Sequence, residues 1–193
     1  LRTEYKCPGI SVCVRTADQV LWHELQGFAD VDKQSPLATD HLFRIGSTSK
    51  ALTSIGLAIL IEQGKLDPTA PIQQYVPSFP KKKYPITLRQ LAGHQAGIRG
   101  YDFAKGENHN QRHFQSVTEA LTVFQDSDLL FEPGTQFQYT TYGYTLLSAA
   151  MESAAKTDFI TFMQTQVFQP LGLNHTTPDD VSQSLNRVSF YGI

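Results

Sequence analysis

The segment from Ala51 to Ile61 contains no charged side chain, and this feature constrains the fold more than any other in the sequence. With the residues from Ser47 onward it has the length and composition of a helix, and Gly64 follows where glycine commonly ends helices. A helix that carries no charge on any side is normally buried at the centre of its domain. The uncharged run is shorter than the roughly 20 residues that a membrane-spanning helix requires. The sequence therefore predicts a folded domain built around a central buried helix.

Two strands precede this helix. In Gly9–Thr16 apolar and polar residues alternate, which is the pattern of a strand with one buried face. A short turn leads to a second apolar stretch, Val20–Phe28, so the two stretches predict an antiparallel hairpin. The polar, turn-rich stretch from Ala29 to His41 is expected to be irregular surface chain.

The rest of the sequence predicts helices and long loops. Helices are expected at 87–92, 117–124, 142–155 and 159–168. A lone hairpin is marginally stable in water, and no obvious strand follows residue 30, so the sheet is expected to gain strands from sequence beyond Ile193 or from another chain. The predicted fold class is therefore α+β. We expect one domain over 1–193, with the hairpin and its loop in 1–46 and a mostly helical lobe in 47–193.

Composition excludes some classes of function. With 16 Lys and Arg against 18 Asp and Glu, the formal net charge of −2 provides no basic excess for nucleic-acid binding. Apolar residues at 40% and aromatic residues at 11% can fill a core, so disorder is not expected. Cys7 and Cys13 would lie roughly 20 Å apart in an extended segment, too far for a disulfide, and are expected to be free thiols.

Three serines stand three residues before a lysine, a spacing that brings two side chains together on a helix. The pairs are Ser47/Lys50, Ser78/Lys81 and Ser153/Lys156. The second pair includes Pro80, which disfavours a continuous helix, and the third lies in the last turn of a predicted helix, where lysine complements the helix dipole. Ser47 instead lies at the start of the predicted central helix.

The start of a helix offers a serine two kinds of chemical assistance. Unpaired backbone N–H groups and the positive end of the helix dipole stabilise an alkoxide or an oxyanion there. The amine of Lys50 is one turn further on, where apolar surroundings favour the neutral form that acts as a general base. On spacing alone, a helix-capping Ser47 with a surface Lys50 is the commoner arrangement, because serine is a frequent N-cap.

Six parts of the sequence follow one another in an order and spacing found in a known family. They are Pro8–Val12, Gly27–Val31, Phe43–Lys50, Gln63–Asp67 with Val76–Pro77, Ile86–Leu91 with His94–Ile98, and Pro133–Leu147. In these landmarks the chain resembles the serine hydrolases that include class C β-lactamases, D-alanyl-D-alanine carboxypeptidases and related esterases. The resemblance runs from about Pro8 to Thr176. It implies a β-lactamase/transpeptidase-like fold, in which helices flank an antiparallel sheet beside a helical lobe.

The resemblance also implies roles for individual side chains. Ser47 would be the nucleophile, Lys50 the residue that activates it, and Tyr139, whose pKa a neighbouring cation must lower, a partner in proton transfer to the leaving group. Thr141 would bind substrate where the family usually has Asn, although a hydroxyl cannot present a carbonyl and an amine together. This Tyr-x-Thr version resembles the mitochondrial β-lactamase-like branch of animals, which is associated with peptidase activity. His94 is interpreted as a structural loop residue rather than a base.

Other candidate sites receive less support. The family's third motif, Lys-Thr-Gly or His-Thr-Gly, would follow Ile193, so residues 1–193 are expected to lack part of the active site. His109 and His113 are four residues apart in a polar loop without a third ligand nearby, so no metal site is expected. The sequence has no Gly-x-Ser-x-Gly elbow and no phosphate-binding glycine loop, and no cofactor is expected.

The predicted function is hydrolysis through a covalent acyl-enzyme on Ser47, with an amide, lactam or ester as substrate. β-Lactamases, D-alanyl-D-alanine carboxypeptidases, peptidases and esterases of this type share one scaffold, so the fold does not separate them. The alternative is a non-catalytic relative that binds peptide or assembles with copies of itself. The expected partner is a small-molecule or peptide substrate, with no nucleic acid and no transmembrane span. The expected location is the periplasm or cell surface in a bacterium and the mitochondrion in an animal.

Overall fold

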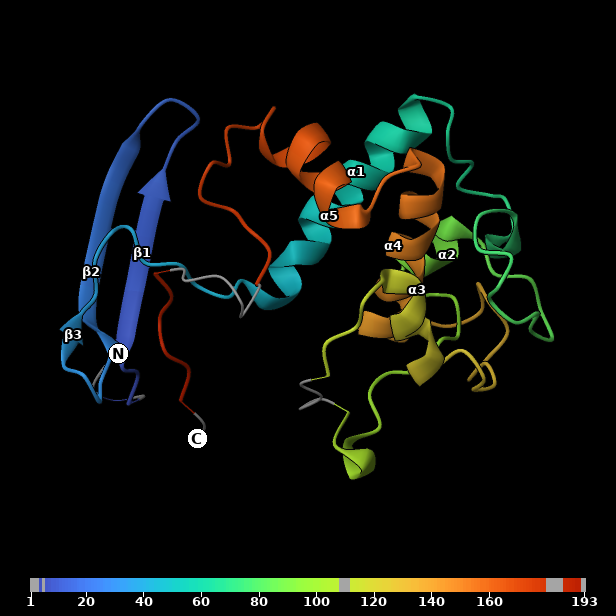
Figure 1. Cartoon of the computed structure of the whole chain (residues 1–193), viewed down its shortest axis with the longest axis horizontal. Helices are drawn as coiled ribbons and strands as arrows, with labels where there is room; N and C mark the ends of the chain where they lie inside the picture. Colours follow the sequence, from blue (N-terminus) through green and yellow to red (C-terminus); the bar gives the residue numbers. More distant parts are fainter. Residues whose placement is uncertain (1–3, 5, 108–111, 180–185, 192–193) are drawn as a thin grey trace. The chain divides into compact units, whose positions relative to one another are not determined.

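The computed structural model describes residues 4, 6–107, 112–179 and 186–191 (Figure 1). The chain divides into two compact units. Residues 46–177 form the helical unit, and residues 1–45 with 178–193 form the sheet unit. The boundary falls next to the one expected between 46 and 47, but the residues from 178 onward return to the sheet unit. A single-domain organisation over 1–193 stays a prediction.

The sheet unit contains an antiparallel sheet in the order β1-β2-β3. Strand β1, Gly9–Arg15, pairs along its length with β2, Val20–Asp30, in the hairpin that the alternation predicts. Gly9 faces Gly27, whose φ is +89°. A Cβ at Gly27 would lie 2.2 Å from the Pro8 carbonyl oxygen, so this close approach of two backbones requires glycine.

A third strand, β3, spans Ser35–Pro36 and pairs with β2. The expectation of irregular chain throughout 29–41 is therefore wrong at this point. In the turn before β3, Asp30 accepts hydrogen bonds from the Lys33 backbone N–H at 3.0 Å and from the Lys33 ammonium at 2.9 Å. Gln34 then adopts a φ of +51° and directs the chain back to β2. Two residues are too few to display an alternating pattern, so the sequence carries no signal for this strand.

A later segment of the chain also pairs within the sheet unit. Leu42 forms a parallel bridge with Arg187. The Leu42 N–H donates to the Asn186 carbonyl at 2.7 Å, and the Val188 N–H donates to the Leu42 carbonyl at 3.1 Å. The sequence shows no obvious strand after residue 30, and yet this bridge and β3 add pairing there. The bridge partners are too far apart in sequence to form a recognisable pattern.

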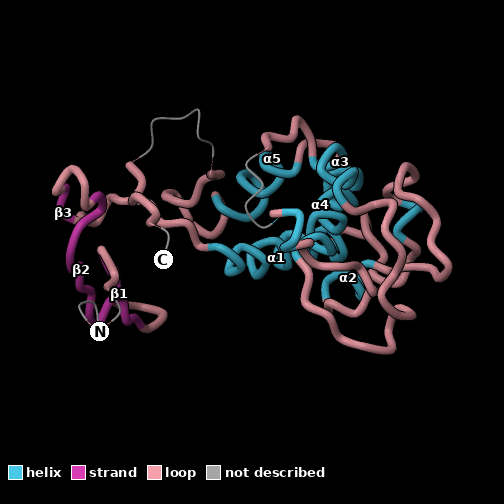
Figure 2. Tube along the Cα trace, turned by 90° about the horizontal axis from the view of Figure 1, so that it is seen from below, coloured by secondary structure: helices cyan, strands magenta, loops and turns pink. Residues whose placement is uncertain are grey.

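The helical unit consists of α-helices joined by long loops (Figure 2). Its helices are α1 (Ser49–Glu62), α2 (Leu88–Ala92), α3 (Val117–Ala120), α4 (Thr141–Ala155) and α5 (Phe159–Met163). Tighter 3-10 turns occur at Gly46–Thr48, Ile72–Gln74, Phe103–Lys105 and Leu121–Val123, and α5 continues into a π-helical turn, Gln164–Phe168. The expected helices are present, but those over 117–124 and 159–168 change to other turn types partway.

The core of the helical unit surrounds α4, which contacts each of the four other helices. Side chains in this core that are fully excluded from solvent include Leu60, Leu88, Leu91, Leu146, Leu147, Ala150, Met151 and Val167. Gly56 allows α1 to come close to its neighbours. A Cβ at Gly56 would lie 2.9 Å from Met163 Sδ and 3.0 Å from Met151 Cε. Because interiors are closely packed, the missing side chain at this position determines how α1 lies against α4 and α5.

One side of α1 is exposed, although the absence of charge predicts a helix buried all round. The buried residues of α1 are Thr53, Gly56, Leu57 and Leu60. Ala51, Ile55 and Ala58 are exposed, and Ile55 keeps 40% of its surface accessible. Their spacing of four and three residues places them along one side of the helix. Because α4 and α5 pack on the other side, the expectation of full burial is wrong for this half of α1.

The ends of α1 and α2 lie where the sequence has residues that typically end or begin a helix. Gly64 follows α1 with a φ of +66°, and the Lys65 N–H donates back to the Leu60 carbonyl at 2.9 Å. At the start of α2, the Thr87 hydroxyl accepts a hydrogen bond from the Gln90 backbone N–H, and the Gln90 side chain accepts one from the Thr87 backbone N–H. This reciprocal capping satisfies two backbone donors that helix formation leaves unpaired.

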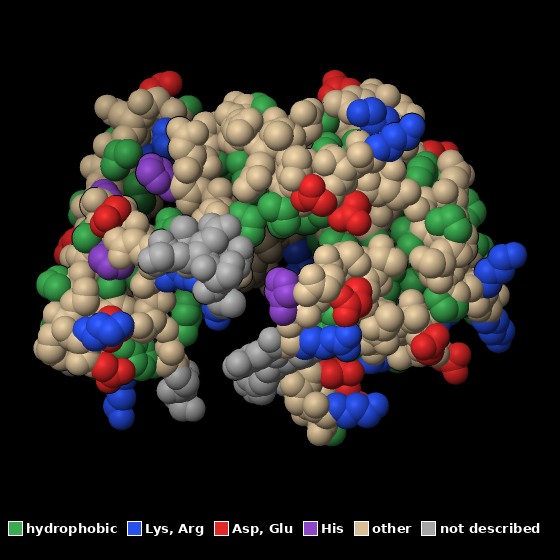
Figure 3. All heavy atoms as spheres, viewed as in Figure 1, with side chains coloured by type: hydrophobic (Ala, Val, Ile, Leu, Met, Phe, Trp, Pro, Cys, Tyr) green, Lys and Arg blue, Asp and Glu red, His purple; other side chains and the backbone are tan. Residues whose placement is uncertain are grey.

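The surface is of mixed charge. Lys and Arg side chains are interspersed with Asp and Glu on the face that Figure 3 shows. Within the described part of the chain, no helix combines the length and the hydropathy needed to cross a membrane. Cys7 and Cys13 are free thiols.

Candidate active site

Ser47 lies in the middle of the 3-10 turn that leads into α1. Gly46 enters this turn with a φ of +52°, and the Ser49 hydroxyl donates to the Gly46 carbonyl at 2.7 Å. The N-cap residue of α1 is Thr48, so Ser47 stands just outside the helix and does not cap it. The Ser47 side chain is thereby exposed at the helix start.

Lys50 reaches Ser47 within one helical turn. Its Nζ donates to Ser47 Oγ at 3.3 Å, and the residue is half-buried. The same Nζ lies 5.0 Å from the centre of the Tyr139 ring and 5.6 Å from that of Tyr144. Aromatic faces attract a cation, so the two rings favour a position of the ammonium group near the serine.

Tyr139 approaches Ser47 from the segment before α4. Its hydroxyl donates to Ser47 Oγ at 2.7 Å, across a sequence separation of 92 residues. Hydrogen bonds with Lys50 and Ser47, together with the charge of Lys50, lower the pKa of the Tyr139 phenol from its ordinary value of 10.0, against an opposing effect of burial. The structure therefore brings Ser47, Lys50 and Tyr139 together at one atom, Ser47 Oγ.

Two further side chains, Tyr144 and Ser54, lie next to Lys50. The Tyr144 hydroxyl donates to the Ala92 carbonyl at 3.1 Å and lies 3.2 Å from Ser54 Oγ. Ser54 follows Lys50 by four residues, so the helical spacing that relates Ser47 to Lys50 could also have indicated Ser54. No spacing in the sequence indicates Tyr144, because its contacts arise only from the packing of α4 against α1 and α2.

His94 packs against the aromatic rings of the site. Its ring centre lies 4.5 Å from that of Tyr139 and 5.2 Å from that of Tyr144. Its Nδ1 accepts a hydrogen bond from the Thr140 backbone N–H at 3.2 Å. Burial, and then the charge of Lys50, lower the pKa of His94 from its ordinary value of 6.5. A histidine interpreted from sequence as a loop residue thus contacts the candidate site.

A largely buried ion pair supports the segment that carries Tyr139. The Arg99 guanidinium donates to the two carboxylate oxygens of Glu107 at 2.7 and 3.0 Å, and the Tyr142 hydroxyl donates to the same carboxylate at 2.9 Å. The hydrogen bond from Arg99 lowers the pKa of Glu107 to about 2, and burial raises the pKa of Tyr142. The Thr140 hydroxyl donates to the Arg99 carbonyl at 2.6 Å. These bonds join the loop that begins at Arg99 to the start of α4.

Thr141 stands apart from this cluster. It is the first residue of α4 and is half-buried. None of the side-chain hydrogen bonds found among the described residues joins it to Ser47, Lys50 or Tyr139. His109 lies outside the described residues. Within the described ranges, no group of three or more His, Cys, Asp or Glu residues is arranged to hold a metal ion.

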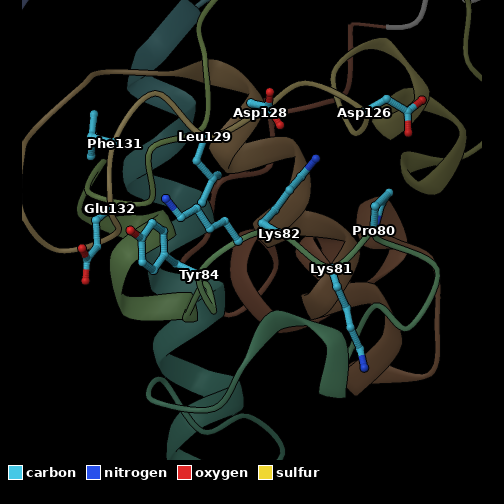
Figure 4. A pocket seen from close by; sticks show the side chains of 10 residues that line it. Pro80, Lys81, Lys82, Tyr84, Asp126, Asp128, Leu129, Phe131 and Glu132 are labelled. Carbon is cyan, nitrogen blue, oxygen red and sulfur yellow. The ribbon is translucent and has the colours of Figure 1, made fainter.

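A cavity of about 650 Å³ opens elsewhere in the helical unit (Figure 4). It is lined by Pro80, Lys81, Lys82, Lys83, Tyr84, Asp126, Asp128, Leu129, Phe131 and Glu132. Lys81 and Lys82 point in opposite directions (Figure 4), and Lys82 Nζ donates to the carbonyls of Gln125 and Ser127. Because this lysine binds backbone carbonyls and the lining includes no residue of the Ser47 cluster, we interpret the cavity as a structural feature.

The chain is similar to known proteins along most of its length. A model of the β-lactamase family matches residues 1–187. The human mitochondrial serine β-lactamase-like protein LACTB is 30% identical over 259 residues, which cover 99% of this chain and 47% of the relative. Penicillin-binding protein 4* of Bacillus subtilis is 29% identical over 184 residues, which cover 94% of this chain and 40% of the relative. The chain thus spans less than half the length of these curated relatives.

A solved structure shows the same fold. The octameric penicillin-binding protein homologue from Pyrococcus abyssi superposes with a TM-score of 0.82 at 23% identity, over 97% of this chain and 44% of that chain. This likeness confirms the β-lactamase/transpeptidase-like fold with its antiparallel sheet and helices. The match over residues 1–187 confirms the resemblance carried by the six sequence landmarks. The chain belongs to the β-lactamase family.

Proposed function

We propose that the protein is a serine hydrolase that forms a covalent acyl-enzyme on Ser47 and acts on an amide, lactam or ester. The observation that carries this proposal is the convergence of Lys50 Nζ, at 3.3 Å, and the Tyr139 hydroxyl, at 2.7 Å, on Ser47 Oγ. Groups that exchange protons next to one hydroxyl are what an activated nucleophile requires. Membership of the β-lactamase family supports the same type of reaction.

In acylation, Ser47 Oγ attacks the carbonyl carbon of the substrate and gives up its proton. The Tyr139 phenolate receives the proton, and Lys50, as the neighbouring cation, assists by lowering the pKa of Tyr139 and so increasing the phenolate fraction. Tyr139 then protonates the departing amine or alkoxide. Unpaired backbone N–H groups at the start of α1 favour the negative charge that develops on the carbonyl oxygen.

In deacylation, water attacks the carbonyl carbon of the acyl-enzyme, the bond to Ser47 Oγ breaks, and the acyl group leaves as an acid while Ser47 Oγ regains a proton. The rate of this step separates a hydrolase from a protein that retains its acyl group. We place Thr141, at the first turn of α4, in contact with the substrate, where its hydroxyl offers a donor and an acceptor. A hydroxyl where the family usually has Asn favours a peptide or ester substrate over a lactam antibiotic.

Intact-mass spectrometry tests the nucleophile. The longest natural chain that contains residues 1–193 is incubated with a fluorophosphonate and, separately, with a penicillin. We expect one adduct that maps to Ser47 and no adduct in Ser47→Ala. Ser78→Ala is the matched control, because Ser78 also precedes a lysine by three residues, and it should be labelled like the wild type. A persistent adduct in folded Ser47→Ala would overturn the assignment.

A non-catalytic relative that binds peptide or assembles with copies of itself is the second candidate. Thr141 in place of the family's usual Asn favours this function, and the homologue from Pyrococcus abyssi is octameric. This candidate predicts no adduct in the folded wild type. It also predicts a molar mass in light scattering that is a multiple of the protomer mass.

A further inference from the structure

His94 is held at both its backbone and its ring. Its φ of +56° lies in the left-handed region, which residues with a Cβ seldom adopt. Its carbonyl accepts the Gln138 N–H at 2.9 Å, and its Nδ1 accepts the Thr140 N–H at 3.2 Å. These two hydrogen bonds flank Tyr139, and the imidazole itself lies 4.5 Å from the Tyr139 ring. The backbone of Tyr139 is therefore tied to His94 on both sides.

The bond from Thr140 defines the protonation state of His94. A ring nitrogen that accepts an N–H carries no hydrogen, so the imidazole is neutral with its hydrogen on Nε2. A second proton would turn Nδ1 into a donor facing the Thr140 N–H, and this hydrogen bond would be lost. The titratable groups that face His94 are Lys50 on α1, Tyr144 on α4 and Tyr139 itself. An imidazolium here would also stand beside the Lys50 cation.

We propose that His94 is a positioning residue for Tyr139: its neutral imidazole holds the phenol on Ser47, and protonation of the imidazole releases it. This inference rests on the proposed function of Ser47. Tyr139 is 45% exposed, so surrounding side chains do not enclose its ring. The contacts with His94 therefore supplement the hydrogen bond from the Tyr139 hydroxyl to Ser47. The hydrogen bonds of His94 described above go to the segment around Tyr139, so His94 acts through Tyr139.

The proposal has a consequence for the pH dependence of acylation. Burial and the Lys50 charge keep the pKa of His94 below 6.5, so the imidazole is neutral at pH 7 and holds Tyr139 there. As the pH falls through the pKa of His94, the imidazole becomes charged and the Thr140 bond is lost. This loss adds to the decline that protonation of the Tyr139 phenolate causes, so the rate of Ser47 acylation falls more steeply once His94 becomes charged.

Three substitutions separate the contributions of the acceptor, the ring and the backbone. His94→Asn keeps an acceptor and tolerates a left-handed backbone, but takes up no proton. His94→Phe keeps a ring without an acceptor, and His94→Gly suits the backbone but keeps neither. We expect His94→Asn to retain most of the second-order rate of fluorophosphonate labelling at neutral pH. At lower pH this variant should keep only the decline that protonation of the Tyr139 phenolate causes, without the additional loss that the wild type shows when His94 becomes charged. We expect labelling of His94→Phe and His94→Gly to fall by about tenfold or more, as for a misplaced catalytic group.

The titration of Tyr139, followed by NMR on tyrosine labelled with ¹³C at the phenol carbon, adds a readout that is independent of turnover. We expect a lowered pKa of Tyr139 in the wild type and in His94→Asn, and a pKa closer to 10 in His94→Phe, where the phenol leaves Lys50 and Ser47. The positioning role would be overturned if all folded variants showed the same labelling rate, the same pH dependence of labelling in acid and the same Tyr139 titration. A shifted titration in His94→Phe without any labelling of the wild type would overturn the proposed function and support the positioning role.

Discussion

At the scale of single residues, the contact with Tyr139 distinguishes Ser47/Lys50 from the other two Ser-x-x-Lys pairs. The spacing is the same in all three pairs, so spacing alone does not identify a nucleophile. In Ser153/Lys156, the lysine instead follows the last turn of α4 with a φ of +55° and ends the helix. The contact that distinguishes Ser47 crosses 92 residues of sequence, which no local pattern displays. Tyr139 was therefore accessible from sequence only through the resemblance to a family.

Replacing Tyr139 by Phe is expected to slow acylation of Ser47 by about 100-fold, because the ring remains beside His94 but the proton-transfer group is gone. The second-order rate constant of fluorophosphonate labelling measures the effect. Tyr84→Phe is the control, since it removes a phenol hydroxyl that lines the cavity in Figure 4 and should leave labelling unchanged. Labelling of Tyr139→Phe at the wild-type rate would mean that Lys50 alone moves the proton.

At the scale of elements, helices were predictable where an apolar pattern and capping residues coincide. The bounds of α1, α2 and α4 lie within two residues of those expected. Prediction was less accurate for the expected helices over 117–124 and 159–168. In both, the α-helix changes partway to another turn type, at Leu121 and at Gln164. Hydroxyl-to-carbonyl bonds do not explain the change, because Thr53 and Ser54 form such bonds within α1, which stays α-helical.

The close approach of α1 to its neighbours predicts the effect of adding a side chain at Gly56. Gly56→Leu is expected to lower the free energy of unfolding by about 2 kcal/mol, because the new atoms overlap Met163 and Met151. Urea denaturation measures the change. The matched control is Ala58→Leu on the exposed side of the same helix, which should change stability by less than about 0.5 kcal/mol. Equal stabilities of the two variants would contradict the packing described for Gly56.

At the scale of the whole molecule, the order of the elements and the family were predictable, whereas the pairing of distant segments was not. A sequence shows which side chains lack charge but not which neighbours cover them. This is why the burial of α1 was overestimated at Ile55. For the same reason, the roles of His94 and Tyr144 around Lys50 follow only from tertiary packing. Strand β3 is likewise defined by its partner, β2, and not by its own two residues.

The stability of the whole molecule is expected to fall in acid. Hydrogen bonds and cations lower the pKa values of Asp30, Asp67, Glu107, Glu119 and Asp158. A carboxyl group with a lowered pKa stabilises the fold above its unfolded pKa, and this contribution is lost as the pH falls through the folded pKa. For Glu107 these two values are 4.5 and about 2. The contribution of Glu107 that is lost over this range is about 3 kcal/mol.

Urea denaturation at pH 6, 4 and 3 measures this dependence. We expect the free energy of unfolding to decrease stepwise from pH 6 to pH 3. Glu107→Gln should be less stable at pH 6 and show a shallower decrease, because Arg99 then lacks its carboxylate at every pH. A wild-type free energy of unfolding that is the same at pH 6 and pH 3 would refute the acid sensitivity.

In the proposed mechanism, Ser47 obtains its two proton-transfer partners at different stages of structure formation. Lys50 is three residues away and comes with the first turn of α1, whereas Tyr139 arrives only when the helical unit has assembled. We therefore expect a chain that has opened locally to keep Lys50 near Ser47 and to lose the contact with Tyr139. Under the proposed function, Ser47 then reaches its full reactivity only in the complete fold, and chemical labelling of Ser47 would measure conformational integrity.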